Sequence, residues 1–184
     1  TLDQPYALAQ RGVTSLAASQ NYGNFDADTL TFNIRPYIQA RRGTALASGV
    51  NREKSQYRVF YTSGEALYLT IHNGKYLGAL PQAFPNPVTC WCEGSTTSGA
   101  ETSYFGSSDG YVRQMDVGPS FDGAVIPFTL HLNYDSMKNT RASKRFRKAA
   151  IELTASSRVQ FSVGYSIGYG DSEARQQPPY AIAV

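Results

Sequence analysis

A short hairpin built around a glycine recurs along this chain of 184 residues and constrains its fold more than any other feature. In the clearest copy, Thr102–Asp116, two apolar-bearing runs, Ser103–Phe105 and Tyr111–Met115, flank the polar turn at residues 107–110. The turn ends in an Asp-Gly pair, which supplies the positive backbone angles that a tight hairpin requires. The sequence therefore predicts an antiparallel strand pair with a polar tip.

Two similar units surround Gly12 and Gly64. Each has two short apolar-bearing runs, namely Tyr6–Gln10 with Val13–Leu16 and Tyr57–Tyr61 with Ala66–Thr70. Together with Gly110, these turn glycines lie roughly 50 residues apart, a period at which propeller blades and similar β-arrays repeat. We therefore expect an all-β chain whose antiparallel hairpins and meanders form blade-like sheets, as in a partial β-propeller or a propeller-like fold.

The stretch 56–80 shows the clearest strand pattern. Apolar residues alternate before and after Gly64, and Asn73-Gly74 supplies a second hairpin turn, so that a three-stranded meander is predicted. Ala45–Val50 is a candidate strand ahead of it, and the three prolines of Pro81–Pro87 predict a crossing to the next unit, which begins with Val88–Glu93.

The second half of the chain predicts further strands. Val125–Tyr134 alternates apolar and polar residues, although Pro127 restricts its pairing at one edge. Arg141–Leu153 fits a helix or a strand, and we favour a strand over Phe146–Thr154 that pairs with Val159–Tyr169. We expect blade-like repeats over residues 1–124, an antiparallel β segment packed on them over residues 125–170, and an extended tail over residues 171–184.

One brief helical segment is expected before the first meander. Asp26 or Asp28 is a candidate N-cap for a helix through Leu30–Ile34. Pro36 removes a backbone donor and biases Arg35 toward an extended conformation, so that we expect the helix to end there.

The composition of the chain argues only against a strongly basic nucleic-acid binder and a membrane-spanning protein. The formal net charge is +3, which is far from the charge density of a dedicated nucleic-acid binder. No apolar run approaches the length that crosses a bilayer, and no signal-type leader is visible. Because the first residue is Thr rather than Met, we expect that the chain is processed or is a fragment of a larger protein.

The two cysteines, Cys90 and Cys92, flank Trp91 in a predicted strand. Positions i and i+2 of a strand share a face at a separation too large for a relaxed disulfide. Free cysteines are usually buried, so we expect two buried thiols. Neither His72 nor His131 sits at a spacing that would complete a metal site with them.

No catalytic motif is present, and we expect neither enzymatic activity nor a cofactor or bound metal. His72 and His131 have no catalytic partner nearby in sequence, and their expected roles are a turn residue and an outward-facing strand residue. Asp109 is expected to bond its own turn backbone.

A basic cluster is the strongest charge feature. The cluster contains about a third of the seventeen basic residues of the chain. Its members are Lys138, Arg141, Lys144, Arg145, Arg147 and Lys148. Three interpretations remain open: contact with an acidic neighbouring subunit, a solvated edge strand protected by positive charge, and phosphate binding. Subunit contact is favoured, and these six residues are the candidate subunit-contact site.

Four tyrosines form a second candidate surface, for a sugar or a protein: Tyr104, Tyr111, Tyr165 and Tyr169. Aromatic residues are enriched where contacts are made. Packing within the sheets is the alternative, and it is favoured by ordinary strand preference.

Several of these motifs, in their order along the chain, resemble β-rich tail structural proteins of tailed bacteriophages. The motifs are the stretches 51–60, 104–112, 118–123 and 144–148. Within that group the chain is most similar to the nozzle or tail-tube proteins of short-tailed phages, and the resemblance covers roughly residues 6–170. A closed propeller of six or more blades needs about 40–45 residues for each blade. The total length of such a propeller exceeds that of this chain, so we again expect a fragment.

The resemblance implies a virion structural protein that acts by assembly and helps to form a DNA-exit conduit. It implies a homo-oligomer, expected as a sixfold ring, that contacts other tail proteins, with DNA passing without sequence-specific binding. A carbohydrate- or receptor-binding β module at the virion surface is the alternative, and a hydrolase with paired carboxylates is a third, disfavoured one.

Overall fold

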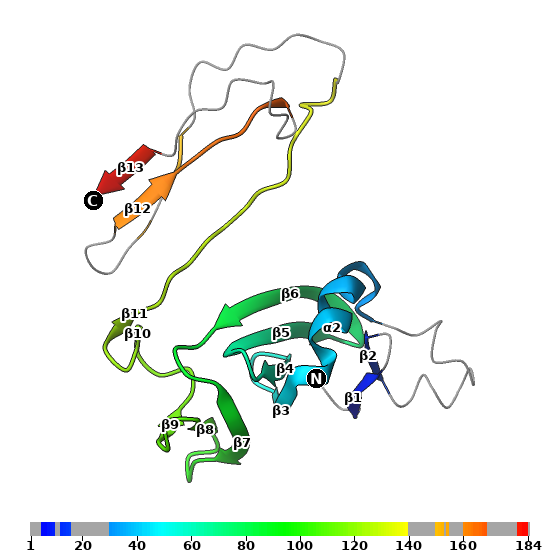
Figure 1. Cartoon of the computed structure of the whole chain (residues 1–184), viewed down its shortest axis with the longest axis vertical. Helices are drawn as coiled ribbons and strands as arrows, with labels where there is room; N and C mark the ends of the chain where they lie inside the picture. Colours follow the sequence, from blue (N-terminus) through cyan, green and yellow to red (C-terminus); the bar gives the residue numbers. More distant parts are fainter. Residues whose placement is uncertain are drawn as a thin grey trace. The chain divides into compact units, whose positions relative to one another are not determined.

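The computed structural model describes residues 5–9, 12–15, 30–139, 150–152, 154, 160–168 and 180–183. The chain divides into two compact units, Thr1–Pro127 and Phe128–Val184, and the first contains most of the regular structure (Figure 1). The described part is predominantly β, with antiparallel sheets and one short α-helix. The predicted all-β class is therefore confirmed at this level.

A four-stranded antiparallel meander forms the middle layer of the first unit. Its strands follow one another in space as in sequence, and they are β3 (Ala45–Asn51), β4 (Gln56–Tyr61), β5 (Glu65–His72) and β6 (Lys75–Ala83). The predicted turns at Gly64 and Gly74 are confirmed, with φ of 82° and 72°. The candidate strand at 45–50 pairs with β4 and extends the predicted meander by one strand.

Both faces of this sheet are covered, because alternate side chains of β4 and β5 enter two separate cores. Tyr57, Val59 and Leu69 belong to one core, whereas Phe60 and Tyr68 belong to the other. Strands buried on both faces are apolar at nearly every position, and β4 and β5 fit that description. The stretch with the clearest strand pattern in the sequence, which contains β4 and β5, thus forms the centre of the fold.

The first face is covered by the N-terminal hairpin and a helix. The hairpin consists of β1 (Tyr6–Ala9) and β2 (Gly12–Ser15), with Ala9 opposite Gly12, which confirms the predicted hairpin. Val13 and Ile38 are fully buried against the sheet.

The helical segment differs from the prediction. A 3₁₀ turn, η1 (Phe32–Ile34), leads into α2 (Arg35–Arg41) and a second turn, η2 (Arg42–Thr44). Pro36 begins the α-helix rather than ending the preceding helix, so the prediction was wrong here. In the first helical turn a backbone N–H has no intrahelical partner, and proline is favoured there because its missing donor is not needed.

The second face is covered by a three-stranded antiparallel sheet, β7 (Val88–Ser95), β8 (Glu101–Ser107) and β9 (Val112–Gln114). Its buried Val88 and Phe105, together with Met115 just after β9, pack against Phe60 and Tyr68 of the central sheet. The turn between β8 and β9 contains Gly110 with φ of 89°, so the third predicted hairpin is confirmed.

Trp91 joins the two sheets. Its indole stacks on Phe60 with ring centroids 5.4 Å apart and an interplanar angle of 26°. It also lies directly over Gly49 of β3, where a Cβ atom would overlap the indole ring. Gly49 therefore supplies the space into which the only tryptophan packs.

The inward position of Trp91 explains why the prediction of buried thiols was wrong. Neighbouring strand residues point to opposite faces, so Cys90 and Cys92 lie on the outer face, where both are free and exposed. The absence of a disulfide between them agrees with the strand geometry.

Beyond β9 the strands are short. Ser120–Phe121 (β10) pairs with Ala124–Val125 (β11). In the second unit β12 (Gln160–Val163) pairs with β13 (Tyr180–Ala183), so the segment predicted as an extended tail contributes a strand. Most of the partner predicted for this strand, Phe146–Thr154, lies outside the described residues.

The predicted strand at 125–134 is wrong after Val125. Residues 126–134 have no regular structure, because no strand of the described chain pairs with them. A strand needs a hydrogen-bonded neighbour, and the alternating sequence alone cannot supply one.

We expect the substitution Gly49→Ala to destabilise the chain by about 1–3 kcal/mol, as overpacking in a filled core does, because the new Cβ displaces Trp91 from Phe60. Urea denaturation followed by Trp91 fluorescence measures the change. Gly78→Ala is the matched control, since a Cβ at Gly78 of β6 meets no atom within 4 Å. Equal stability of the two variants would contradict the account of Trp91.

Candidate assembly site

An exposed apolar segment follows β11. Phe128, Leu130 and Leu132 are 78%, 68% and 82% exposed, and the residues between them are polar. The structure gives residues 126–133 no hydrogen bond to another described residue. The segment therefore has the composition of a half-buried strand but neither a paired backbone nor a covered apolar face.

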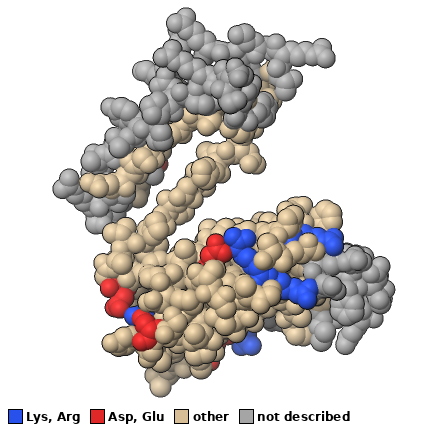
Figure 2. Space-filling model, in the orientation of Figure 1, with Lys and Arg blue, Asp and Glu red and all other residues tan. Residues whose placement is uncertain are grey.

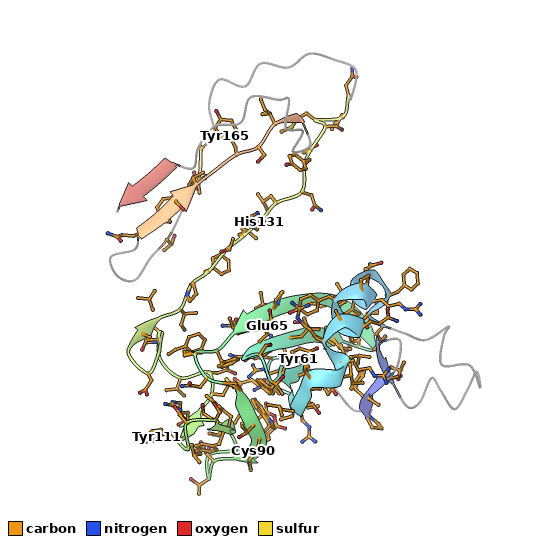
Figure 3. All side chains as sticks on the ribbon, in the orientation of Figure 1. Tyr61, Glu65, Cys90, Tyr111, His131 and Tyr165 are labelled. Atoms are coloured by element: carbon orange, nitrogen blue, oxygen red, sulfur yellow. The ribbon has the colours of Figure 1, made fainter. Side chains whose placement is uncertain are left out.

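The segment also lacks charge. No Asp, Glu, Lys or Arg occurs between Asp122 and Asp135, and the stretch that follows β11 is free of blue and red in Figure 2. His131 is exposed near its middle (Figure 3). Nothing in the segment opposes its burial against another apolar surface.

The predicted basic cluster begins just after this segment. Lys138 is exposed and has a φ of 68° in a turn. The other members, Arg141, Lys144, Arg145, Arg147 and Lys148, lie outside the described residues, so the role of the cluster in subunit contact stays a prediction.

A pocket lies where the segment leaves the first unit. It has a volume of about 570 Å³, within the range of roughly 300–1,000 Å³ typical of ligand pockets. Its apolar wall includes Phe84, which lies 5.8 Å from Phe105 and 5.3 Å from Phe121 between ring centroids. Ile126, at the root of the segment, also lines it.

The rim of this pocket carries charges that are already paired. Lys54 Nζ lies 3.1 Å from Asp116 Oδ2, and Arg113 Nη2 lies 3.2 Å from Asp122 Oδ2. The cation and the anion of each pair neutralise one another, so neither pair offers an uncompensated charge to a charged ligand.

Arg113 also organises the turn at Asp109. Its guanidinium bonds the Asp109 carboxylate, and this contact, with the backbone N–H of Tyr111, lowers the pKa of Asp109 to about 2. The expected local role of Asp109 is confirmed. The part played by Arg113 was missed, although its i+4 position after Asp109 was a visible signal.

A buried cation lies between the two sheets. Arg58 is 1% exposed, and its Nη2 donates 2.7 Å hydrogen bonds to Gln56 Oε1 and Asp116 Oδ2. Its guanidinium also lies 4.4 Å from the centre of the Tyr68 ring. Sequence reasoning missed this residue, because an arginine inside an alternating strand looks like an outward-facing position.

The candidate tyrosines do not form the packed set that strand preference favoured. Tyr104, Tyr111 and Tyr165 are 43%, 66% and 58% exposed, and Tyr169 lies outside the described residues. Packing within the sheets is wrong for Tyr111 and Tyr165, which lie outside the strands, whereas Tyr104 lies on β8 and is partly covered. Tyr104 and Tyr111 come from β8 and the turn before β9, whereas Tyr165 belongs to the second unit.

The described histidines and cysteines do not form a metal-binding cluster. His72 and His131 are exposed, and within the described ranges no three side chains of the His, Cys, Asp or Glu type come together in a way that could hold a metal ion.

Two carboxyl groups meet at the other end of β7 and β8. Glu101 accepts hydrogen bonds from the backbone N–H groups of Arg52 and Glu53, at 3.0 and 2.7 Å, and so ties β8 to the loop between β3 and β4. Burial and the hydrogen bond with Glu101 raise the pKa of Glu93 to about 7. Burial alone would raise the pKa of Glu101, but the hydrogen bonds from Glu93 and the two backbone groups lower it.

We expect the stability of the chain to rise as the pH falls from about 7 to about 4.5. In that window the folded state binds a proton at Glu93 that the unfolded state does not. Because Glu93 is only partly buried, solvent screening limits the gain to about 1 kcal/mol. Denaturation at a series of pH values measures it, and Glu93→Gln should remove the rise while the exposed control Glu53→Gln keeps it. A rise that survives Glu93→Gln would refute the assignment.

In the part of the chain that the structure describes, no helix has the length and apolar character needed to cross a membrane. Comparison of the chain with protein-family models, with curated proteins and with solved structures found no significant match.

Proposed function

We propose that this chain is a structural component of a bacteriophage tail, of the nozzle or tail-tube type, that acts by assembly and has no catalytic role. It belongs to the virion, and several copies surround the DNA exit path, as a sixfold ring in contact with other tail proteins. The proposal combines the resemblance in motif order with the geometry of the exposed segment.

The observation that carries the proposal is the exposed apolar face of residues 126–132. Three large apolar side chains, Phe128, Leu130 and Leu132, are mostly exposed in a single copy. Contiguous exposed apolar surface of this kind marks an interaction site or an aggregation hazard. A subunit that works inside an assembly has a reason to keep it.

The first unit suits a scaffold. Its central sheet is packed on both faces, so it is stiff, and adjacent sheets that pack face to face are also the arrangement of propeller blades. We propose that these sheets are blade-like elements whose ring is completed by other copies. Head-to-tail contacts between different surfaces generate closed rings when the rotation closes.

We expect the purified chain to form an oligomer and the double variant Leu130→Asp, Leu132→Asp to be monomeric. Two carboxylates buried without partners oppose association strongly. Sedimentation velocity over a hundredfold range of concentration measures the state of both.

The matched control is Thr129→Asp with His131→Asp, which places two carboxylates at the intervening polar positions of the same segment. It should assemble like the unchanged chain. A monomer at every concentration for the unchanged chain, together with no binding to other tail proteins of its particle, would remove the proposal, and electron microscopy of the particle tests the location directly.

A carbohydrate- or receptor-binding module is the second candidate. It is favoured by the exposure of Tyr104 on β8 and Tyr111 in the turn before β9, since tyrosine is enriched where contacts are made. A glycan array tests this candidate. If no glycan binds and the chain assembles, the binding module is excluded and the structural role is retained.

A further inference from the structure

The pocket beside Phe84 and Phe121 belongs to the first unit. Ile126 lines the pocket, but Phe128, Leu130 and Leu132 further along are exposed. One chain therefore presents both an open apolar cavity and an uncovered row of apolar side chains.

The chemistry of the pocket points to an uncharged apolar occupant. Its rim cations and anions are paired, as Lys54 with Asp116 and Arg113 with Asp122, so that a charged ligand would have to displace an existing partner. Burial of an unpaired charge is costly, whereas burial of alkyl and aromatic side chains is favourable.

The arrangement of the rings disfavours a flat sugar-stacking platform. Phe84 and Phe105 meet edge to face at 64°, and Phe84 and Phe121 are tilted at 46°. Phe105 is also 92% buried, since only 8% of it is exposed. Rings packed on one another in this way form the wall of a cavity for side chains of any apolar shape.

We propose that this pocket accepts the apolar segment, residues 126–132, of a second copy of the chain. This inference rests on the proposed function and names the contact through which the copies assemble. The donor segment has no charge, no backbone partner among the described residues and alternating apolar side chains, and the acceptor has a volume of about 570 Å³ and a neutral rim.

The contact joins two different surfaces, a segment on one copy and a pocket on the next. Each copy therefore donates once and accepts once, and the assembly grows head to tail until it closes. Because Ile126 lies at the pocket, every acceptor site sits at the root of the segment that its own chain donates onward.

The donor and the acceptor can be disabled separately. The variant Leu130→Asp, Leu132→Asp disables the donor. Ala124→Glu disables the acceptor, since Ala124 is exposed in the lining of the pocket and a carboxylate added there opposes the burial of an apolar segment. Ala45→Glu is the matched control, because Ala45 is equally an exposed strand alanine but lies away from the pocket.

Neither disabled variant should assemble alone, whereas an equimolar mixture should form a one-to-one complex, in which the segment of the Ala124→Glu chain enters the pocket of the other. Sedimentation velocity measures this complex. A synthetic peptide with the sequence of residues 124–134 should bind the donor-disabled chain, and Ala124→Glu added to that chain should weaken binding at least about tenfold.

The outcomes separate this inference from the proposed function. If the unchanged chain is monomeric, the proposed function fails and the inference fails with it. If the unchanged chain assembles and Ala124→Glu assembles equally well, the segment binds elsewhere and only the pocket assignment is overturned. Should Ala124→Glu fail to fold, Gln82→Glu, a nearly isosteric change at the same pocket, gives the same decision through peptide binding.

Discussion

The first unit depends on the contact of Trp91 with Phe60 above Gly49. This contact joins the sheet β7–β9 to the central meander, and it requires a residue without a side chain on β3. Around it, Arg58 is withdrawn from water and held by Gln56, Asp116 and the Tyr68 ring. Aromatic stacking and the hydrogen bonds that Arg58 donates from Nε and Nη2 lie in one layer and tie the two sheets together, whereas its buried Nη1 has no hydrogen-bond partner among the described residues.

The rigid body and the exposed segment are complementary in physical terms. The inner strands β4 and β5 are covered on both faces, and the exposed large apolar residues of the central sheet, Leu46, Leu77 and Leu80, lie on its edge strands β3 and β6. Residues 126–132, in contrast, carry apolar area that remains in water, and each exposed apolar Å² forgoes about 25 cal/mol of stabilisation. A chain of this design gains stability when another surface covers the segment, which is the expected behaviour of a subunit that functions in an assembly.

How far the sequence predicts this structure depends on how local each feature is. The hairpins at Gly12, Gly64 and Gly110 follow from turn glycines next to alternating runs, and all three are present. Pro36 was misjudged because proline has opposite effects in the first turn of a helix and in its interior, and its sequence neighbours do not say which applies. Cys90 and Cys92 were misplaced because three neighbouring apolar residues leave the choice of face open until the large indole takes the inner one.

The candidate site divides in the same way. The alternation of Phe128, Leu130 and Leu132 is visible in the sequence, but their exposure is not, since alternation indicates a strand and says nothing of whether a partner exists within the chain. The aromatic pocket is lined by residues from β6, β8, β10 and the loops between them. No spacing of residues in the sequence predicts that they lie together. By itself the sequence determined the turns, the strand alternation and the lack of charge after Asp122, because these depend on neighbouring residues. Only the tertiary structure decided which faces are buried, that Arg58 is a core residue and that the segment has no partner among the described residues, because these depend on contacts between residues far apart in the chain.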